Sequence, residues 1–296
     1  MRYDVIIIGG SYGGIAAALQ LVRARRAVLV IDAGAPRNRF AAHSHGYLGQ
    51  DRVPPGEISA LARRELGAYP TLTWIEGEAV AMDGAREAFQ ISLRDGQTVE
   101  GRRVLFATGS RDPLPEIPGL KDRWGISVFH CPYCHGYELS DRRIGVIGTE
   151  PMSVHQAELL ADWGDVTFFP NETITVDRDA HDALKARNVA IVEGAIARIT
   201  GIADIALENG QTLAFDGLFI ITATVQASSI PADIGAALQE TPLGTIIETS
   251  ETNETSVQGV YACGDAATMP QFVSSAVGDG AMAGVHIHHS LVWPDT

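Results

Sequence analysis

Residues 4–14 read Asp-Val-Ile-Ile-Ile-Gly-Gly-Ser-Tyr-Gly-Gly, an apolar run that stops at a group of glycines. A β-branched run without polar alternation is typical of a strand buried on both faces of a sheet. The Ala- and Leu-rich stretch from Gly14 to Arg23 predicts a helix, and residues 27–31 predict a second buried strand that ends at Asp32. Strand, glycine turn, helix and strand in this order indicate a nucleotide-binding βαβ unit.

The glycine turn has the placement of a dinucleotide-binding loop. Glycines in such a loop permit a tight bend and let the backbone approach a pyrophosphate at a helix N-terminus. Gly9, Gly10 and Gly14 fit this role, whereas Ser11 stands where a second glycine of the motif is usual. Asp32 is placed to accept hydrogen bonds from ribose hydroxyls. A turn that is merely tight is the alternative, but its position between a buried strand and a helix favours the dinucleotide site.

The same order of elements recurs in the second half of the chain. Residues 143–148 read Arg-Ile-Gly-Val-Ile-Gly, residues 153–163 predict a helix, and residues 166–169 predict a strand. Two nucleotide-type units in register form an internal repeat at the scale of a domain.

This repeat predicts an α/β protein with two Rossmann-like, three-layer ββα nucleotide-binding domains, the second inserted in the first. Prolines at positions 113, 115 and 118 interrupt regular structure and mark a linker. We place the first domain at residues 1–112 and 242–296, and the insert at residues 113–241.

The composition excludes several classes of protein. The chain has 296 residues, of which 46% are hydrophobic, and a net charge of -14. Nucleic acids and anionic membrane surfaces attract clustered Lys and Arg, so neither is expected as a partner. No apolar run approaches the roughly 20 residues that span a bilayer. Met1 leads directly into the first strand without an export signal, so we expect a cytoplasmic protein.

Residues 130–136 read His-Cys-Pro-Tyr-Cys-His-Gly and contain two of the three cysteines, Cys131 and Cys134. In a cytoplasmic protein this spacing indicates redox chemistry or half of a metal site. A zinc site would need a second pair of ligands, and attachment of a c-type haem would need an exported protein. A glutaredoxin-like site would need a small βαβ domain of its own. Buried structural thiols remain a further alternative. A redox pair would attack as a thiolate, and His130 or His135, if protonated, would lower a cysteine pKa.

The ends of two further strands carry a resemblance to a known family. Ala107-Thr108-Gly109 and Cys263-Gly264-Asp265, taken with the first glycine turn and a C-terminal helix, resemble the flavoprotein disulfide reductases with two dinucleotide domains. Length and cysteine position resemble the low-molecular-weight thioredoxin reductases. The resemblance implies FAD on the first domain and a flavin-coupled dithiol, with no metal. The residues that it implies around FAD are Gly9, Gly10, Ser11, Gly14, Asp32, Ala107, Thr108, Gly109, Gly264, Asp265, Gln271, Phe272 and Val273.

The string Cys-Pro-Tyr-Cys-His-Gly-Tyr-Glu, from position 131, narrows the resemblance. It is similar to the FAD-dependent dithiol oxidases of the gliotoxin and holomycin type and their bacterial relatives. The resemblance implies that Cys134 is the flavin-proximal thiol and that Cys131 exchanges with substrate. His135 stands where the thioredoxin reductases have an acid, and it keeps a proton donor or acceptor there. The stretch His43-Ser44-His45 is either near the flavin or substrate or a polar surface loop, and we weigh the two equally.

The second glycine turn has lost most of its motif. It reads Gly-Thr-Glu-Pro-Met-Ser over residues 148–153, so Glu150 would place a carboxylate beside a pyrophosphate, and Pro151 removes a backbone N–H. The next strand ends at Pro170-Asn171, without the arginines that grip a 2′-phosphate in the family. We expect NADP(H) to bind weakly or not at all. Ordinary divergence, with NADPH or NADH held through other residues, is the alternative.

The sequence therefore predicts a FAD-dependent thiol–disulfide oxidoreductase. Electrons would pass between a substrate dithiol, the Cys131–Cys134 pair and the flavin. A reductase of thioredoxin or of a related protein disulfide is the alternative function, and a flavin redox sensor without turnover is the second. The expected partners are a small dithiol or disulfide, or a thioredoxin-like protein, and a second copy of the chain in a homodimer.

Overall fold

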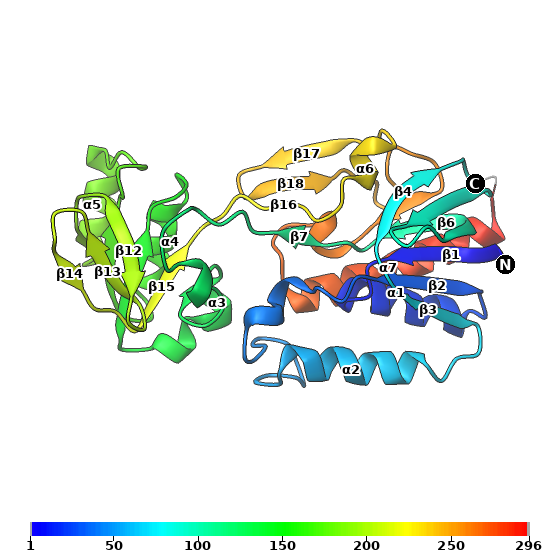
Figure 1. Cartoon of the computed structure of the whole chain (residues 1–296), viewed down its shortest axis with the longest axis horizontal. Coiled ribbons are helices and arrows are strands. Elements are labelled where there is room, and N and C mark those ends of the chain that lie inside the picture. Colours follow the sequence, from blue (N-terminus) through cyan, green and yellow to red (C-terminus); the bar gives the residue numbers. More distant parts are fainter. Residues whose placement is uncertain (1, 295–296) are drawn as a thin grey trace. The chain divides into compact units, whose positions relative to one another are not determined.

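The opening apolar run forms strand β1 (Arg2–Ile8) inside a seven-stranded sheet (Figure 1). This computed structural model describes residues 2–294 of the chain. β1 pairs in parallel with β2 (Val28–Asp32) on one side and with β6 (Thr98–Phe106) on the other. Val5, Ile6 and Ile7 are fully buried, as expected for a strand covered on both faces.

The chain divides into two compact units. Unit 1 comprises residues 1–39, 55–111 and 224–296, and unit 2 comprises residues 40–54 and 112–223. This division differs from the expected domain ranges in two segments. Residues 224–241 belong to unit 1, because β16 (Val225–Gln226) pairs with β7 (Ser110–Arg111). Residues 40–54 belong to unit 2, where they pack against residues 130–138, the cysteine segment.

Unit 1 has the order β3-β2-β1-β6-β5-β4, with β19 beside the second half of β6. Strands β3, β2, β1, β6 and β19 are parallel, whereas β5 pairs in the antiparallel sense with both β6 and β4. The further elements of this unit are α1 (Tyr12–Arg23), α2 (Pro55–Leu66), β3 (Leu72–Glu76), β4 (Ala79–Asp83), β5 (Phe89–Leu93), α6 (Ile230–Asp233), β17 (Leu238–Thr241), β18 (Gly244–Ile247), β19 (Val260–Ala262), η4 (Gly264–Ala266) and α7 (Val273–Val292). The 3₁₀ helix η1 (Arg37–Phe40) ends at the first crossing into unit 2.

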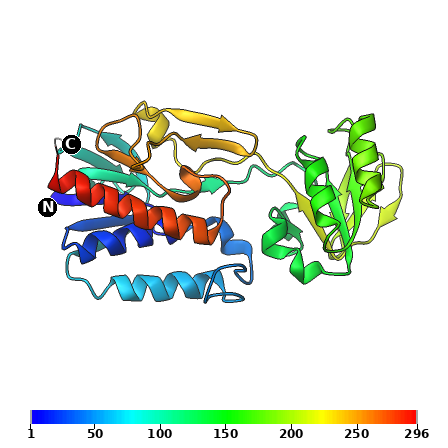
Figure 2. The same ribbon diagram turned by 180° about the vertical axis from the view of Figure 1, so that it is seen from behind.

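The two faces of this sheet are covered differently. Val5 and Ile7 pack on the side of α1 and α7, and Ile6 and Ile8 pack with the residues of β5. Helix α7 runs beside α1 (Figure 2), and the approach is close enough that a Cβ on Gly280 would lie 2.1 Å from the carbonyl oxygen of the first turn of α1. The result is a layer of helices on one face and a layer of strands on the other, as predicted.

Unit 2 repeats this architecture with a five-stranded parallel sheet of order β11-β10-β9-β15-β8. Helices α4 and α5 pack on one face, and the small antiparallel sheet β12-β13-β14 packs on the other. Its elements are η2 (Lys121–Arg123), β8 (Val128–Phe129), α3 (Pro132–His135), η3 (Tyr137–Leu139), β9 (Arg143–Ile147), α4 (Ser153–Leu160), β10 (Asp165–Phe169), α5 (Arg178–Ala186), β11 (Ala190–Ile191), β12 (Ile196–Thr200), β13 (Asp204–Leu207), β14 (Thr212–Leu213) and β15 (Gly217–Ile220). The predicted α/β class with two Rossmann-like domains is confirmed.

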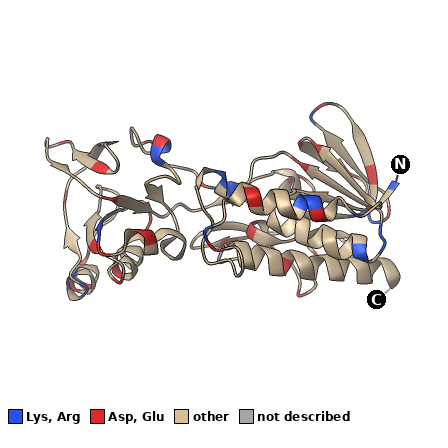
Figure 3. Ribbon diagram, turned by 90° about the horizontal axis from the view of Figure 1, so that it is seen from below, with Lys and Arg blue, Asp and Glu red and all other residues tan. Residues whose placement is uncertain are grey.

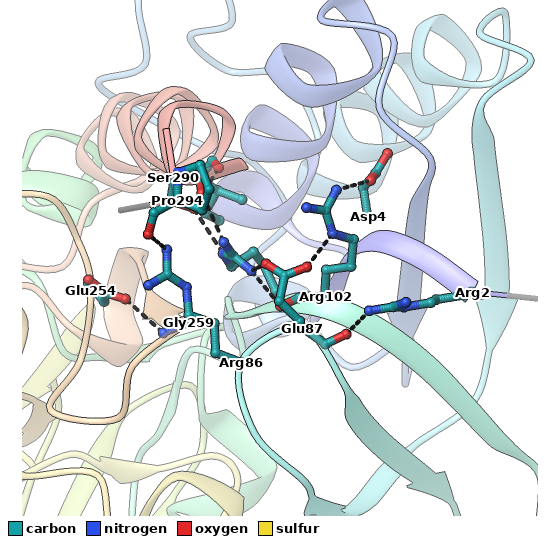
Figure 4. A network of polar contacts seen from close by, with 11 residues as sticks. Arg2, Asp4, Arg86, Glu87, Arg102, Glu254, Gly259, Ser290 and Pro294 are labelled. Carbon is teal, nitrogen blue, oxygen red and sulfur yellow. Dashed lines mark hydrogen bonds and ion pairs between the residues drawn. The ribbon is translucent and has the colours of Figure 1, made fainter. Parts of the chain in front are cut away.

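A charged network ties β6 to the end of α7 in unit 1 (Figure 4). Arg103 is fully buried, and it donates to Glu87 and to the hydroxyl and carbonyl oxygens of Ser290. Arg102 pairs with Glu87 and with Asp4. Burial alone would raise the pKa of Glu87, but the hydrogen bonds from the two arginines lower it to about 2. A buried arginine is tolerated here because its charge is paired and its N–H groups are bonded.

Charged residues are distributed over helices, strands and loops of both units (Figure 3). Between residues 2 and 294, no helix is long and apolar enough to cross a membrane.

Candidate functional site

The predicted cofactor residues of unit 1 gather at one edge of its sheet. Ile8 is in register with Phe106, which is in register with Ala262, and all three strands run in parallel. The loops that follow them therefore lie at the same carboxyl edge, which in open α/β sheets is where ligands bind. These loops begin at Gly9, at residues 107–109 and at residues 263–265. The neighbouring helix α7 begins at Val273, and its N-cap is Phe272.

The backbone of the first glycine turn is packed so closely that it leaves no room for side chains at its glycine positions. Gly9 has φ +108°, and a Cβ there would lie 2.2 Å from the carbonyl oxygen of Ala107. A Cβ on Gly14 would lie 1.9 Å from the carbonyl oxygen of Gly9, and one on Gly10 would lie 2.7 Å from the Cβ of Asp32. Ser11, at the second motif position, has φ -95°, a backbone conformation that any residue adopts. A backbone cradle at the N-terminus of α1 fits the pyrophosphate of a dinucleotide.

Two carboxylates hold the loops of this edge. The N–H of Gly10 donates to Oδ1 of Asp32 at 3.2 Å. Nη1 of Arg37 lies 3.4 Å from Oδ2 of Asp265 and also donates to Oε1 of Gln271, whose Nε2 donates to the Asp265 carbonyl oxygen at 3.1 Å. Oγ1 of Thr108 is buried and has no hydrogen-bond partner within residues 2–294, so it is available to a ligand. The sequence reasoning missed Arg37, whose only signal was that it is one of two arginines shortly after Asp32.

The two cysteines lie at the equivalent carboxyl edge of unit 2. Strand β8 ends just before them, Cys131 is the N-cap of α3, and Pro132 is the first residue of that helix. The N–H of Cys134 donates to the carbonyl oxygen of Cys131 at 3.2 Å, which closes one turn between the two residues. Both cysteines are half-buried. Gln156 of α4 fixes the entry to this turn by donating to the carbonyl oxygen of His130 at 2.7 Å.

His135 ends helix α3 in a largely apolar setting. Its ring stacks on Phe129 with centroids 4.2 Å apart and planes 15° from parallel. Burial, and then the nearby charge of His45, lower the pKa of His135 to about 4. With so low a pKa His135 is neutral at pH 7, so the condition under which it would lower a cysteine pKa, that it be protonated, is not met. A neutral imidazole can still accept a proton, so the role of an acid or base remains a prediction.

Residues 40–54 bring further histidines to this edge. Ser44 pairs with Val53 in a short antiparallel bridge, which folds the segment back on itself. The ring of His45 lies edge-on to that of His135, with centroids 6.3 Å apart, and His43 is exposed. Two interpretations were weighed for residues 43–45, a segment near the flavin or substrate and a polar surface loop. The structure places His45 beside the helix that carries the cysteines.

The second glycine turn is closed by its own side chains. Oγ of Ser153 is fully buried and accepts the N–H groups of Thr149 and Glu150, both at 3.2 Å. The hydroxyl of Thr149 donates in turn to the carbonyl oxygen of Ile221. Two of the amides that would hold a phosphate are thus already bonded within the chain. At the end of β10, the side chain of Asn171 accepts the N–H of Ile196 at 2.8 Å.

No group of three or more His, Cys, Asp or Glu side chains between residues 2 and 294 is arranged to hold a metal ion.

Comparison with known proteins finds a matching family and several similar chains. A family model described as pyridine nucleotide-disulphide oxidoreductase matches residues 3–280. The thioredoxin reductase tcpT of Claviceps purpurea is 31% identical over 95% of this chain and 92% of its own length. A solved oxidoreductase from Agrobacterium tumefaciens is 47% identical, with a TM-score of 0.97 over 100% of both chains. The crystal structure of HlmI is 37% identical, with a TM-score of 0.92 over 99% of this chain and 94% of its own.

Proposed function

This chain belongs to the pyridine nucleotide-disulphide oxidoreductase family, and we propose that it is a FAD-dependent dithiol oxidase. In this proposal a substrate dithiol delivers two electrons to the Cys131–Cys134 pair, and NADP(H) is used weakly or not at all. The resemblance carried by the first glycine turn, the strand ends and the C-terminal helix had implied both the family and the oxidoreductase class. The direction of electron flow and the cofactor use are the proposal.

The residues of the unit 1 edge would hold FAD. The backbone of the first glycine turn fits the pyrophosphate, Asp32 fits a ribose, and the buried hydroxyl of Thr108 offers a hydrogen bond. Asp265 and Gln271, fixed by Arg37, complete the edge. When bound, FAD supplies a two-electron acceptor that returns the cysteine pair to its disulfide and passes the electrons to dioxygen or another acceptor.

The residues of the unit 2 edge would carry out the exchange with substrate. A substrate thiol loses its proton to neutral His135, and the resulting thiolate attacks one sulfur of the Cys131–Cys134 disulfide. An S–S bond forms between substrate and Cys131 while the bond between the cysteines breaks, and Cys134 leaves as a thiolate. The second substrate thiol then displaces Cys131. Substrate dithiol and protein disulfide thus become substrate disulfide and protein dithiol, with atoms and electrons balanced.

The closed second glycine turn is the observation that carries the direction of electron flow. A pyridine nucleotide bound there would have to displace the hydroxyl of Ser153 from two backbone N–H groups and sit beside Glu150. Pro151 has no N–H to offer in compensation. Electrons supplied by a thiol substrate need no such site.

Reduction of a thioredoxin-like protein is the second candidate. The match to a relative named thioredoxin reductase favours it. Both candidates use the same dithiol, so they differ in the source of electrons. A homodimer, common among soluble proteins, remains a prediction.

Oxygen uptake by the FAD-loaded protein tests the proposal. A panel of small dithiols, with dithiothreitol as reference, should give uptake with one disulfide formed per dioxygen consumed if hydrogen peroxide is the product. Cys134→Ser should abolish turnover while the flavin absorbance of the purified protein is retained. Turnover that survives in Cys134→Ser, or turnover seen only with NADPH and thioredoxin, would exclude a dithiol oxidase.

A further inference from the structure

His135 is the group that needs help in the proposed exchange. Its Nδ1 is buried and has no hydrogen-bond partner within residues 2–294, and its ring is stacked on Phe129. A proton taken from a substrate thiol would leave a charged imidazolium in a desolvated position. Efficient turnover therefore requires a neighbour that relieves His135 of this proton.

His45 is positioned as that neighbour. Its ring meets the ring of His135 at 79°, with centroids 6.3 Å apart, a gap that one water molecule can bridge. Its Nδ1 lies 3.6 Å from Oδ1 of Asp51 and 3.6 Å from Oε1 of Glu138. The negative charge of the two carboxylates favours a hydrogen on the nearby Nδ1, which leaves the lone pair on Nε2.

Both carboxylates are open to solvent, and that of Asp51 is also held by the backbone. Oδ1 of Asp51 accepts the N–H of Gly46 at 3.0 Å, within the segment that Ser44 and Val53 close. The side chain of His45 is 14% exposed, whereas those of Asp51 and Glu138 are 59% and 39% exposed. Exposure therefore rises from two partly buried rings, those of His135 and His45, to two exposed carboxylates.

The ionisable groups around His135 come from two segments. The cysteine segment, residues 130–138, contributes His130, Cys131, Cys134 and Glu138, and residues 40–54 contribute His43, His45 and Asp51. Of these, His45 has both a ring beside His135 and a carboxylate at its own nitrogen.

We propose that His45 is a positioning residue for His135. In this role His45 receives the proton that His135 takes from a substrate thiol, and it releases the proton at the Asp51–Glu138 edge. The inference rests on the proposed function. The S–H bond of the substrate breaks, its electron pair stays on sulfur, and the proton moves from His135 to His45 and then to solvent. Residues 40–54, which lie between β2 and α2 in the chain, thereby become part of the dithiol site.

Anaerobic reduction of the FAD-loaded protein by dithiothreitol tests this role. His45→Ala should slow flavin bleaching at pH 7.5 by about 10-fold, which is less than the roughly 100-fold minimum for a group that itself takes the proton, because His45 acts through His135. Added imidazole should restore most of the rate, which a purely structural role would not allow. The control is His155→Ala, an exposed histidine of α4, which should react like the wild-type protein. A wild-type rate in His45→Ala, or a loss that imidazole does not restore, would overturn the proposal.

A second measurement separates this inference from the proposed function. Imidazole NMR of the resting protein follows the titration of His135 directly. The nearby charge of His45 contributes to the low pKa of His135, so His45→Ala should raise that pKa, and an unchanged titration would overturn the coupling. If dithiothreitol fails to reduce even the wild-type protein, the proposed function is wrong, and the NMR titration alone decides whether the two rings are coupled.

Discussion

Replacing His135 by leucine should remove a pH dependence from the stability of the protein. The folded-state pKa of His135 is about 4, against an ordinary value of 6.5. Because the folded pKa is lowered, the unfolded chain binds a proton that the native protein does not bind between these two values. Stability is therefore complete above pH 6.5 and falls as the pH falls toward 4.

The size of the effect follows from the two pKa values. At pH 5 a group with a pKa of 6.5 is almost fully charged in the unfolded chain, while His135 is about 90% neutral in the native protein. Linkage then gives a loss of about 2 kcal/mol between pH 8 and pH 5 from this residue. The value is an upper one because the ring is not completely buried.

Urea unfolding at pH 8 and at pH 5 measures the effect in both proteins. Trp124 and Trp163 of unit 2 report the transition by fluorescence. The wild-type protein should lose about 2 kcal/mol more than His135→Leu on going from pH 8 to pH 5, since all other titrating groups cancel in the comparison. Equal losses in the two proteins would mean that His135 titrates as in a peptide, and the neutral-base reasoning would then fail.

Two further substitutions test unit 1. Glu87→Gln should lower the free energy of unfolding by about 2–3 kcal/mol in a denaturant titration, because Arg103 would be left buried without its carboxylate. The control Glu78→Gln, at an exposed ion pair, should leave the unfolding midpoint unchanged. A midpoint that moves equally in both variants would contradict this prediction. Gly14→Ala should yield protein that is folded by circular dichroism but loses FAD on gel filtration, because the new Cβ would lie 1.9 Å from a backbone oxygen of the turn. The control Gly278→Ala, whose new Cβ meets nothing within 4 Å, should keep the cofactor. Retention of FAD by Gly14→Ala would count against the proposed cradle.

Much of the fold could be predicted from local patterns. Apolar runs that end in glycine mark the central strands of both sheets, and their position before helices identified two nucleotide-type units. Each parallel strand must end at the same edge, so the strand-end loops could be grouped without coordinates. The chain returns to unit 1 at residue 224, whereas the sequence predicted this boundary at residue 242. The true boundary depends on the pairing of two very short strands, β7 and β16. Two-residue strands leave no periodic signal.

The candidate site was less predictable, because its details depend on contacts between distant segments. His45 and His135 meet only through folding, and no rule of spacing connects them. The closure of the second turn depends on a serine hydroxyl that turns back toward two preceding amides, a choice of geometry that the residue type alone does not determine. Arg103 interrupts a buried strand, and its partners Glu87 and Ser290 lie on separate elements. In each case the missing information is tertiary.

Anaerobic mixing of the oxidised, FAD-loaded protein with a small dithiol or with NADPH tests the central claim most directly. The closed second turn predicts that the dithiol bleaches the flavin absorbance, whereas NADPH at the same concentration leaves it unchanged over the same time. Bleaching by NADPH within the dead time of the instrument, with no reaction of the dithiol, would contradict the account and identify the protein as a pyridine nucleotide-driven reductase.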